Sequence, residues 1–390
     1  MEGKIYFDNL ASAPLLAEVY RNMLDSFDNT FASPASLHSY GYESSDIINA
    51  SREKIAKLIG ATGSELNFTS SSAESNSWAI LGLARVNSKK GKHIIISAIE
   101  DRSVIESAEA LKKEGFEVSY VPVDSNGIIK YSELIKTIRR DTILISVMTA
   151  NGIIGTVQPI HAIGKLAKMN GILFHTDASY AVGEIEIDVH ELSIDAMTIS
   201  SNSICGPNGI AGLYVKKGVK IDSIIFGDES DKNTSTRQFL IPLVVGFSKA
   251  VEIAVKNMQY NVRTRKRLRK LLYKKIKENI ANVELIGHPR QRISGNLNLS
   301  FEGVNGEAVS IFLDRRGVEV SSSESPNLYP SHVIRALDLD SSKLFSNVRF
   351  SLSTLNTEEE INTAVVYLTK IVKKLRSVSP VRVYNMRGGK

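Results

Sequence analysis

Apolar residues along the first part of the chain form short β-branched runs that alternate with helical patterns. The runs predict strands at Ile5–Asp8, Glu65–Thr69, His93–Ser97, Glu117–Val121, Thr142–Met148, Ile172–His175, Ala196–Ser200 and Gly212–Val215. Apolar residues at helical spacing predict helices between them, at Ala73–Ala84, Arg102–Glu114, Tyr131–Arg139 and His161–Met169. This alternation predicts an α/β fold, in which helices cover a large and mostly parallel sheet.

The pattern changes after about residue 240. A long helical run, Phe247–Ile280, precedes shorter segments at Gly295–Glu302, Gly306–Asp314, Val318–Ser321, Val348–Leu352 and Thr357–Lys374. This order is typical of a smaller α+β domain. We therefore expect a large domain over residues 15–255, a small domain built from residues 1–14 and 256–376, and a basic tail over residues 377–390.

Polar segments follow four of the predicted strands, and they are Ser70–Glu74, Thr149–Gly155, Asp177–Tyr180 and Ser200–Ser203. In open parallel sheets, ligands bind at the carboxyl ends of the strands. The sequence therefore predicts that these segments converge on one site.

The composition is ordinary for a globular protein, with 43% apolar and 23% charged residues among 390. We find no apolar run of about 18 residues and no signal-peptide pattern before the first strand. The single cysteine excludes an internal disulfide and is typical of a reducing compartment. We expect a cytoplasmic protein that does not enter a membrane.

The formal net charge is +6, and much of the excess lies in Arg263–Lys277. Leucines and isoleucine recur there at helical spacing, so the segment predicts an amphipathic helix with a basic face. That face is either a solvated surface or a site for an acidic protein or a nucleic acid. Neither an aromatic stacking platform nor zinc-ligand spacing supports nucleic-acid binding.

Several segments resemble motifs of the cysteine desulfurases, a branch of the class V aminotransferases. They occur in the family's order from about Ile5 to about Pro380, and they are Tyr6–Pro14, Ser33–His38, Phe68–Ser75, Phe174–Ala178, Ser200–Gly209 and Val348–Leu352. The resemblance implies the type I fold of pyridoxal-phosphate enzymes.

Three catalytic groups of the family are replaced or absent. Ser203 stands at the Schiff-base lysine of the Ser-Gly-His-Lys motif, and a hydroxyl cannot form an imine. Asp101 stands at the histidine that stacks on the cofactor ring, although it is also a good helix N-cap. The loop Val320–Pro330, where the family carries its persulfide-forming cysteine, contains no thiol.

The resemblance also assigns positions around the cofactor. They are Asp177, Asn151, Ser72, Ala73, Ser200, Asn202, Tyr180 and Gln238. Ala73 replaces a phosphate-binding threonine, and Tyr180 replaces a glutamine and is bulkier. Structural alternatives remain, because Asp177 can cap a turn, Asn151-Gly152 is a turn dipeptide, and Ser71 or Ser72 can cap a helix.

A substrate-carboxylate corner is implied at Arg349 and His38, although Arg349 can instead pair with a structural acid. The only cysteine, Cys205, is expected to be structural.

Because several catalytic positions differ together, we expect a degenerate member of the family. It would have neither catalysis nor a bound cofactor, and it would serve as a binding or scaffold subunit. One alternative is an active pyridoxal-phosphate enzyme that holds its cofactor non-covalently. Another is a nucleic-acid or ribosome-associated protein. The resemblance also implies a homodimer or a heterodimer with an active relative.

Overall fold

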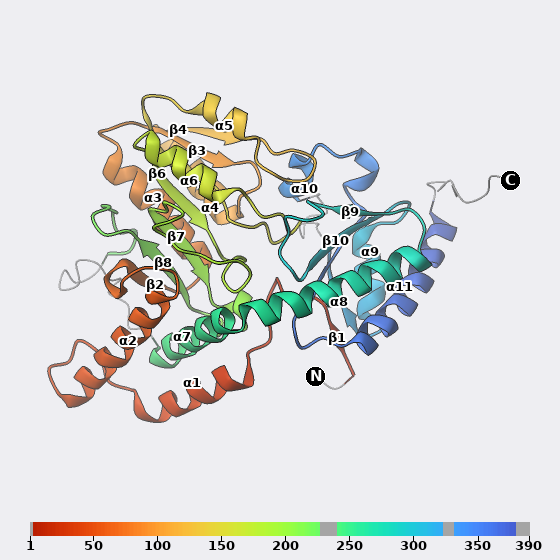
Figure 1. Ribbon diagram of the computed structural model, residues 1–390, viewed down its shortest axis with the longest axis horizontal. Helices are drawn as coiled ribbons and strands as arrows, with labels where there is room; N and C mark the ends of the chain where they lie inside the picture. Colours follow the sequence, from red (N-terminus) through yellow and green to blue (C-terminus); the bar gives the residue numbers. More distant parts are fainter. Residues whose placement is uncertain (1–2, 227–239, 323–330, 380–390) are drawn as a thin grey trace.

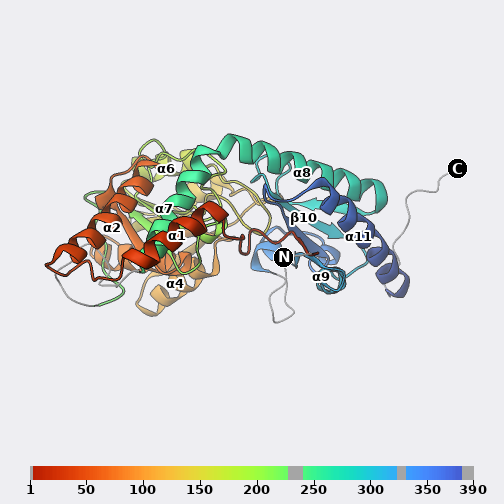
Figure 2. The ribbon, with the colours of Figure 1, turned by 90° about the horizontal axis from the view of Figure 1, so that it is seen from below.

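The computed structural model describes residues 3–226, 240–322 and 331–379. Figures 1 and 2 show two halves, joined on one side by a long helix, α8 (Met258–Asn279).

The larger half is built on a seven-stranded sheet of order β2-β8-β7-β6-β5-β3-β4. The strands are β2 (Leu66–Thr69), β8 (Ala211–Val215), β7 (Ala196–Ser200), β6 (Leu173–Asp177), β5 (Thr142–Ser146), β3 (His93–Ser97) and β4 (Glu117–Val121). β8 runs antiparallel to both β2 and β7, and the other pairings in this sheet are parallel. The predicted α/β fold with a mostly parallel sheet is therefore confirmed.

Helices cover this sheet (Figure 1). They are α1 (Ala17–Asn29), α2 (Ser39–Lys57), α3 (Ser72–Asn87), α4 (Arg102–Lys113), α5 (Tyr131–Thr137), α6 (Ile160–Met169) and α7 (Ile241–Lys256). The central strands β3, β5 and β7 are buried throughout. A strand covered on both faces reads as a continuous apolar run, which is why the sequence reveals these strands well.

The smaller half holds an antiparallel sheet of order β12-β13-β10-β9, formed by β12 (Ser321–Ser322), β13 (Asn347–Ser351), β10 (Asn296–Phe301) and β9 (Val283–Ile286). Beside it, β1 (Ile5–Tyr6) pairs with β11 (Val318–Glu319). The helices of this half are α8, α9 (Gly306–Asp314), α10 (His332–Ala336) and α11 (Glu358–Val378).

The two halves have separate apolar cores. One contains Ile145, Phe174 and Phe247, and the other contains Phe7 and Phe350. We propose on this basis that the domains follow the expected division at residues 15–255 and at 1–14 with 256–376.

Some elements differ from the sequence-based prediction. Phe247–Ile280 is two helices, because α7 ends at Lys256 and α8 begins at Met258. α11 continues to Val378, so the first two residues of the predicted tail are helical. The rest of that tail, residues 380–390, lies outside the described residues.

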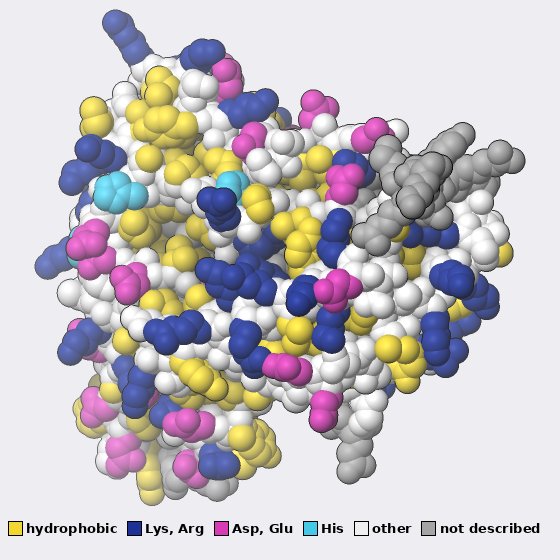
Figure 3. Space-filling view, turned by 45° about the vertical axis from the view of Figure 1, so that its right-hand side comes forward, with side chains coloured by type: hydrophobic (Ala, Val, Ile, Leu, Met, Phe, Trp, Pro, Cys, Tyr) yellow, Lys and Arg dark blue, Asp and Glu magenta, His cyan; other side chains and the backbone are white. Residues whose placement is uncertain are grey.

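The expectation that α8 presents a fully solvated basic face is wrong for two residues. Arg269 is only 8% exposed and donates to the carbonyl of Ile293. Arg265 pairs with Glu184 at 3.1 Å. Other basic residues of α8 remain exposed, and they include Arg263, Lys266 and Lys270. Lysine and arginine side chains also gather across the middle of the face in Figure 3.

Within the part of the chain that the structure describes, no helix combines the length and the apolar character needed to cross a membrane.

Candidate functional site

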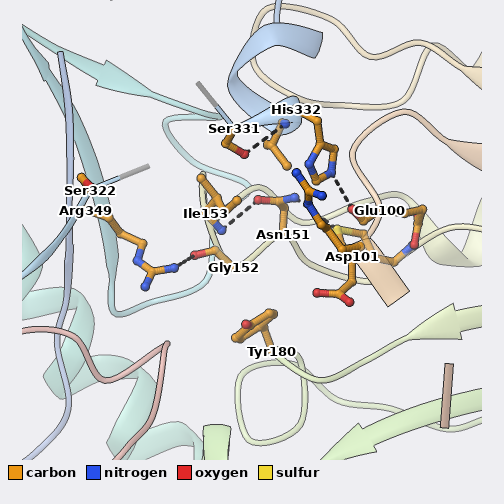
Figure 4. A pocket seen from close by; sticks show the side chains of 13 residues that line it. Glu100, Asp101, Asn151, Gly152, Ile153, Tyr180, Ser322, Ser331, His332 and Arg349 are labelled. Atoms are coloured by element: carbon orange, nitrogen blue, oxygen red, sulfur yellow. Dashed lines mark hydrogen bonds between the residues drawn. The ribbon is translucent and has the colours of Figure 1, made fainter. Parts of the chain in front are cut away.

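The carboxyl ends of the sheet strands meet a cavity of about 320 Å³ (Figure 4). Its lining includes Asp101, which follows β3, and Asn151, which follows β5. Tyr180 follows β6, and Arg349 comes from β13 of the smaller half. Of the four segments predicted to converge, Thr149–Gly155 and Asp177–Tyr180 contribute to this cavity, whereas Ser70–Glu74 and Ser200–Ser203 do not line it.

A chain of hydrogen bonds links the two acids of the site. Asn76 Nδ2 donates to Asp177 Oδ2 at 2.7 Å and to Ser103 Oγ at 3.0 Å. Ser103 donates in turn to Asp101 Oδ1 at 2.5 Å. Burial raises the pKa of Asp177, and the charge of Asp101 raises it further. The presence of an acid at position 101 thus makes the ionised form of Asp177 less favourable.

Asp101 and Asp177 also perform the structural roles that the sequence left open. Asp101 is the N-cap of α4, where its Oδ1 accepts from the Ser103 N–H at 2.8 Å. Asp177 Oδ1 accepts from the Ser179 N–H at 2.8 Å, directly after β6. Neither carboxylate therefore needs a cofactor to explain its position.

Glu100 is a buried acid that borders the same cavity. Its Oε1 accepts from Ser97 Oγ and from the Met148 N–H, whereas Oε2 has no partner among the residues that the structure describes. Burial raises the pKa of Glu100 to about 8. The side chain is therefore largely neutral at pH 7, which reduces the cost of its burial.

Ser203 lies in a short 3-10 helix, Asn202–Ile204, after β7. Its hydroxyl donates to the carbonyl of Ser179 and, at 3.3 Å, to that of Ser200. Ser203 lines a second, smaller cavity of about 70 Å³, together with Cys205. Burial raises the pKa of the Cys205 thiol, so this cysteine is a poor nucleophile.

Tyr180 separates the two cavities, because it lines both of them. Its ring packs against Gly152, where an added Cβ would lie 2.5 Å from a ring carbon. Burial raises the pKa of Tyr180 to about 12. Ser203 lines only the smaller cavity, whereas Asp101 and Arg349 line only the larger one.

The segment implied to hold a phosphate is arranged around its own side chains. Ser71 caps α3, accepting from the Glu74 N–H at 3.2 Å. The N–H and the hydroxyl of Ser70 both donate to the Glu74 carboxylate. Ser72 and Ala73 open α3, so their N–H groups still favour an anion.

Two further positions show similar local bonding. Ser200 Oγ donates to Asn202 Oδ1 at 2.5 Å. Asn151 Oδ1 accepts from the N–H of Ile153, and its Nδ2 donates to the carbonyl of Ile99. Asn151 thus shapes the turn after β5, as its turn dipeptide allows.

Arg349 and His38 are not brought together. Arg349 is 8% exposed and pairs with Asp8 at 2.7 Å. His38 is the exposed N-cap of α2 and lines neither cavity. Within one chain, the implied carboxylate corner therefore consists of Arg349 without His38.

The other implied positions, Gln238 and residues 323–330 of the thiol-free loop, lie outside the described residues.

Besides Glu100, two contributors to the site are not evident from the sequence. Asn76 connects Asp177 to α4, and its only signal was a position one turn into the helix that follows Ser70–Glu74. His332 borders the cavity, and its Nε2 hydrogen-bonds to the carbonyl of Glu100 at 2.8 Å. These two residues lie far from each other in sequence, so a pattern of spacing does not reveal them.

Comparison with known proteins identifies the family. The family described as Aminotransferase class-V matches residues 5–363. The chain is 40% identical over 385 residues to the cysteine desulfurase IscS of Dictyoglomus turgidum, covering 98% of each chain. The chain belongs to the cysteine desulfurase family of class V aminotransferases.

Other members of the cysteine desulfurase family show the same full-length similarity. The cysteine desulfurase IscS of Methanosarcina thermophila is 40% identical over 380 residues, which cover 97% of this chain and 94% of that protein. A solved NifS-like protein superimposes with a TM-score of 0.88 at 31% identity, covering 96% of this chain and all of that one. The fold is therefore that of NifS-like structures, as the resemblance implies.

Pyridoxal phosphate, which this family implies, can be tested against the residues present. The α3 N-terminus can receive an anion, but position 203 offers no amine. Tyr180 occupies space beside Gly152, and Asp101 adds negative charge where the family has a histidine. These residues do not fit a cofactor that is held through an imine to residue 203.

Proposed function

We propose that this member of the cysteine desulfurase family does not form a covalent pyridoxal-phosphate complex and acts as a binding or scaffold subunit. The observation that carries the proposal is the position of Ser203, whose hydroxyl donates to backbone carbonyls. Ser203 lines the smaller cavity, whereas Asp101 and Arg349 line the larger one. A sulfur-transfer or iron–sulfur pathway is the setting that the family favours.

The absence of a suitable thiol supports the same proposal. Sulfur transfer through a persulfide needs a reactive thiolate. The one cysteine of the chain is Cys205, whose pKa is raised by burial. It shares the smaller cavity with Ser203 and lies apart from Arg349.

An active enzyme with a non-covalent cofactor is the second candidate. The full-length identity of 40% to proteins named cysteine desulfurase favours this candidate over the loss of catalysis. Its specific structural support is the N-terminus of α3, where an anion can be bound.

A sulfide-release assay decides between these candidates. The purified protein is incubated with L-cysteine, a reductant and added pyridoxal phosphate, alongside an active relative as positive control. We expect sulfide and alanine at the level of a no-protein blank. Robust release of both, in proportion to protein concentration, would establish the active enzyme.

We further propose that the protein forms a dimer, with itself or with an active relative, in the cytoplasm. Helix α1 exposes three large apolar side chains, since Tyr20, Leu24 and Phe27 are 52%, 43% and 55% exposed. These positions recur at helical spacing and form one stripe. An exposed apolar stripe of this kind is typical of an interface between proteins.

A further inference from the structure

Helix α8 carries a straight row of cations on its outer side. These basic residues follow one another at intervals of three or four positions, and we call them the basic stripe: Arg263, Lys266, Lys270, Lys274 and Lys277. At about 100° and about 1.5 Å per residue, they lie within an arc of about 80° and extend over about 21 Å. All of them are exposed, whereas Leu268, Arg269 and Leu272 on the opposite side of the helix are buried.

Little within the described chain neutralises the basic stripe. Arg263, Lys266 and Lys270 make no hydrogen bond or ion pair with any residue that the structure describes. Lys274 lies 3.8 Å from Glu278, which is the only acid in the sequence of α8. On α4 and α5, by contrast, lysines pair with glutamates three positions away. Like charges three or four positions apart destabilise a helix, so the basic stripe costs stability that a merely solvated face does not require.

The basic stripe lies on a helix that a long partner can reach. α8 bridges the two halves and runs along one edge of the molecule, and no described element lies outside it in Figure 2. None of the residues of the basic stripe lines the larger or the smaller cavity. A macromolecule can therefore bind there whether or not the cavities are occupied.

The spacing of the basic stripe favours an acidic helix over a nucleic acid. Its intervals along the axis, about 4.5 and 6 Å, are those of side chains three and four positions apart on any straight helix. A second helix that packs nearly parallel can present carboxylates at these intervals along the whole stripe. The phosphates of a duplex wind around its axis and complete a turn in about 34 Å, so a straight row of cations leaves their path after a few contacts. The arc of the stripe also contains no aromatic residue on which the bases of a single strand would stack.

We propose that the basic stripe of α8 docks an acidic α-helix of a partner protein, whose carboxylates face the cations of the stripe. The proposal goes beyond the proposed function by naming the kind of partner that a binding subunit would have, and it holds with or without the loss of catalysis. Contacts of this kind speed association and fix the register of the two helices, and they weaken as salt screens them.

Fluorescence anisotropy with the full-length protein tests the inference. The first probe is a labelled, end-capped helical peptide of about 20 residues, with glutamates at i, i+4 and i+7 among alanines. The second peptide has the same composition, but its glutamates are distributed around the helix. A DNA duplex and a single-stranded DNA of matched net charge complete the set. At low ionic strength we expect saturable binding of the patterned peptide, at least about fivefold tighter than that of the scrambled peptide or of either DNA.

Substitutions locate the binding. The stripe variant replaces the unpaired cations, and it combines Arg263→Gln, Lys266→Gln and Lys270→Gln. It should bind the patterned peptide about tenfold more weakly, because each exposed ion pair contributes a modest factor. The control variant removes the same charge from exposed residues outside α8, and it combines Lys89→Gln, Lys90→Gln and Lys168→Gln. It should change the affinity by less than about twofold, and both variants should unfold at the same urea concentration as the unmodified protein.

Carbodiimide crosslinking identifies the contacting residues directly. The reagent joins a carboxylate to an amine that lies against it, and peptide mass spectrometry identifies the lysine. We expect the glutamates of the patterned peptide to be joined mainly to Lys266, Lys270 and Lys274.

Absence of saturable peptide binding up to about 0.5 mM would overturn the inference and leave the basic stripe a solvated surface. Equal affinity for the patterned and scrambled peptides, or an equal loss of affinity in the control variant, would overturn it in favour of an effect of net charge. Tighter binding of either DNA would overturn it in favour of a nucleic-acid surface, and crosslinks mainly to lysines outside α8 would also contradict it. The proposed function fails separately, through a pyridoxal-phosphate complex or sulfide release.

Discussion

At the scale of single residues, the positions that the family uses for its cofactor are engaged in local structure. Asp101 caps a helix, Asp177 caps a turn, and Asn151 shapes the turn after β5. The sequence predicted these structural roles as alternatives. It could not predict how Tyr180 and Gly152 fit together, because that contact joins two different strand ends.

The Tyr180 side chain yields the first prediction. Ser203→Lys alone should give little borohydride-reducible adduct with added pyridoxal phosphate, because residue 203 opens into the smaller cavity. Combining it with Tyr180→Gln removes the ring between the cavities and should raise the yield several-fold. The yield is measured as pyridoxyl-lysine at position 203 by peptide mass spectrometry.

Tyr180→Gln alone is the matched control and should give no adduct at position 203. If Ser203→Lys alone is labelled as completely as the double variant, Tyr180 does not separate the two cavities.

At the scale of elements, the strands of the large sheet were predicted to within a residue or two. The buried strands β3 and β7 and the partly exposed edge strand β4 match their predicted bounds. The helices α1 and α2 were not predicted. α1 buries Val19 and Met23 while exposing an apolar stripe, so apolar residues occur on both faces and weaken its amphipathic pattern. The burial of Arg269 on α8 was not predicted, because composition alone does not show which face of a helix packs against the rest of the molecule.

The second prediction concerns α8. Arg269→Gln should lower the free energy of unfolding by about 1.5–3 kcal/mol, because a buried, charged donor to the Ile293 carbonyl is lost. Lys270→Gln, on the exposed face of the same helix, should change it by less than about 0.5 kcal/mol. Urea unfolding measures both values.

Equal unfolding free energies for these two variants would show that Arg269 is not structural. An acidic or nucleic-acid partner of α8 remains a prediction, and it is best tested with the exposed residues Arg263, Lys266 and Lys270. Changes at Arg265 or Arg269 would confuse loss of binding with loss of folding.

At the scale of the whole molecule, sequence motifs in the correct order predicted the family and the fold, and both are confirmed. The site takes residues from both halves of the molecule. Arg349 comes from β13 of the smaller half, and Asp101 caps helix α4 of the larger half. The pairing of Arg349 with Asp8 depends on that assembly, so the sequence could only leave it open.

The third prediction concerns the dimer. Leu24→Lys with Phe27→Lys should convert a dimer to a monomer at micromolar concentration, because charges would be buried in an apolar interface. Met169→Lys, at a position that is 76% exposed on α6, should leave the dimer intact. Light scattering coupled to size exclusion gives both masses. A monomeric unmodified protein, with no relative co-purifying, would contradict the proposal.

The central claim is that the protein, with Ser203 in place of the lysine, forms no covalent complex with pyridoxal phosphate, and the absorption spectrum tests it most directly. The protein is expressed with pyridoxal phosphate supplied, purified, reduced with borohydride and digested for mass spectrometry. The account predicts a colourless protein, no cofactor band from the near-ultraviolet into the visible, and no pyridoxyl-lysine peptide. A yellow protein that yields a stoichiometric pyridoxyl-lysine peptide would contradict it.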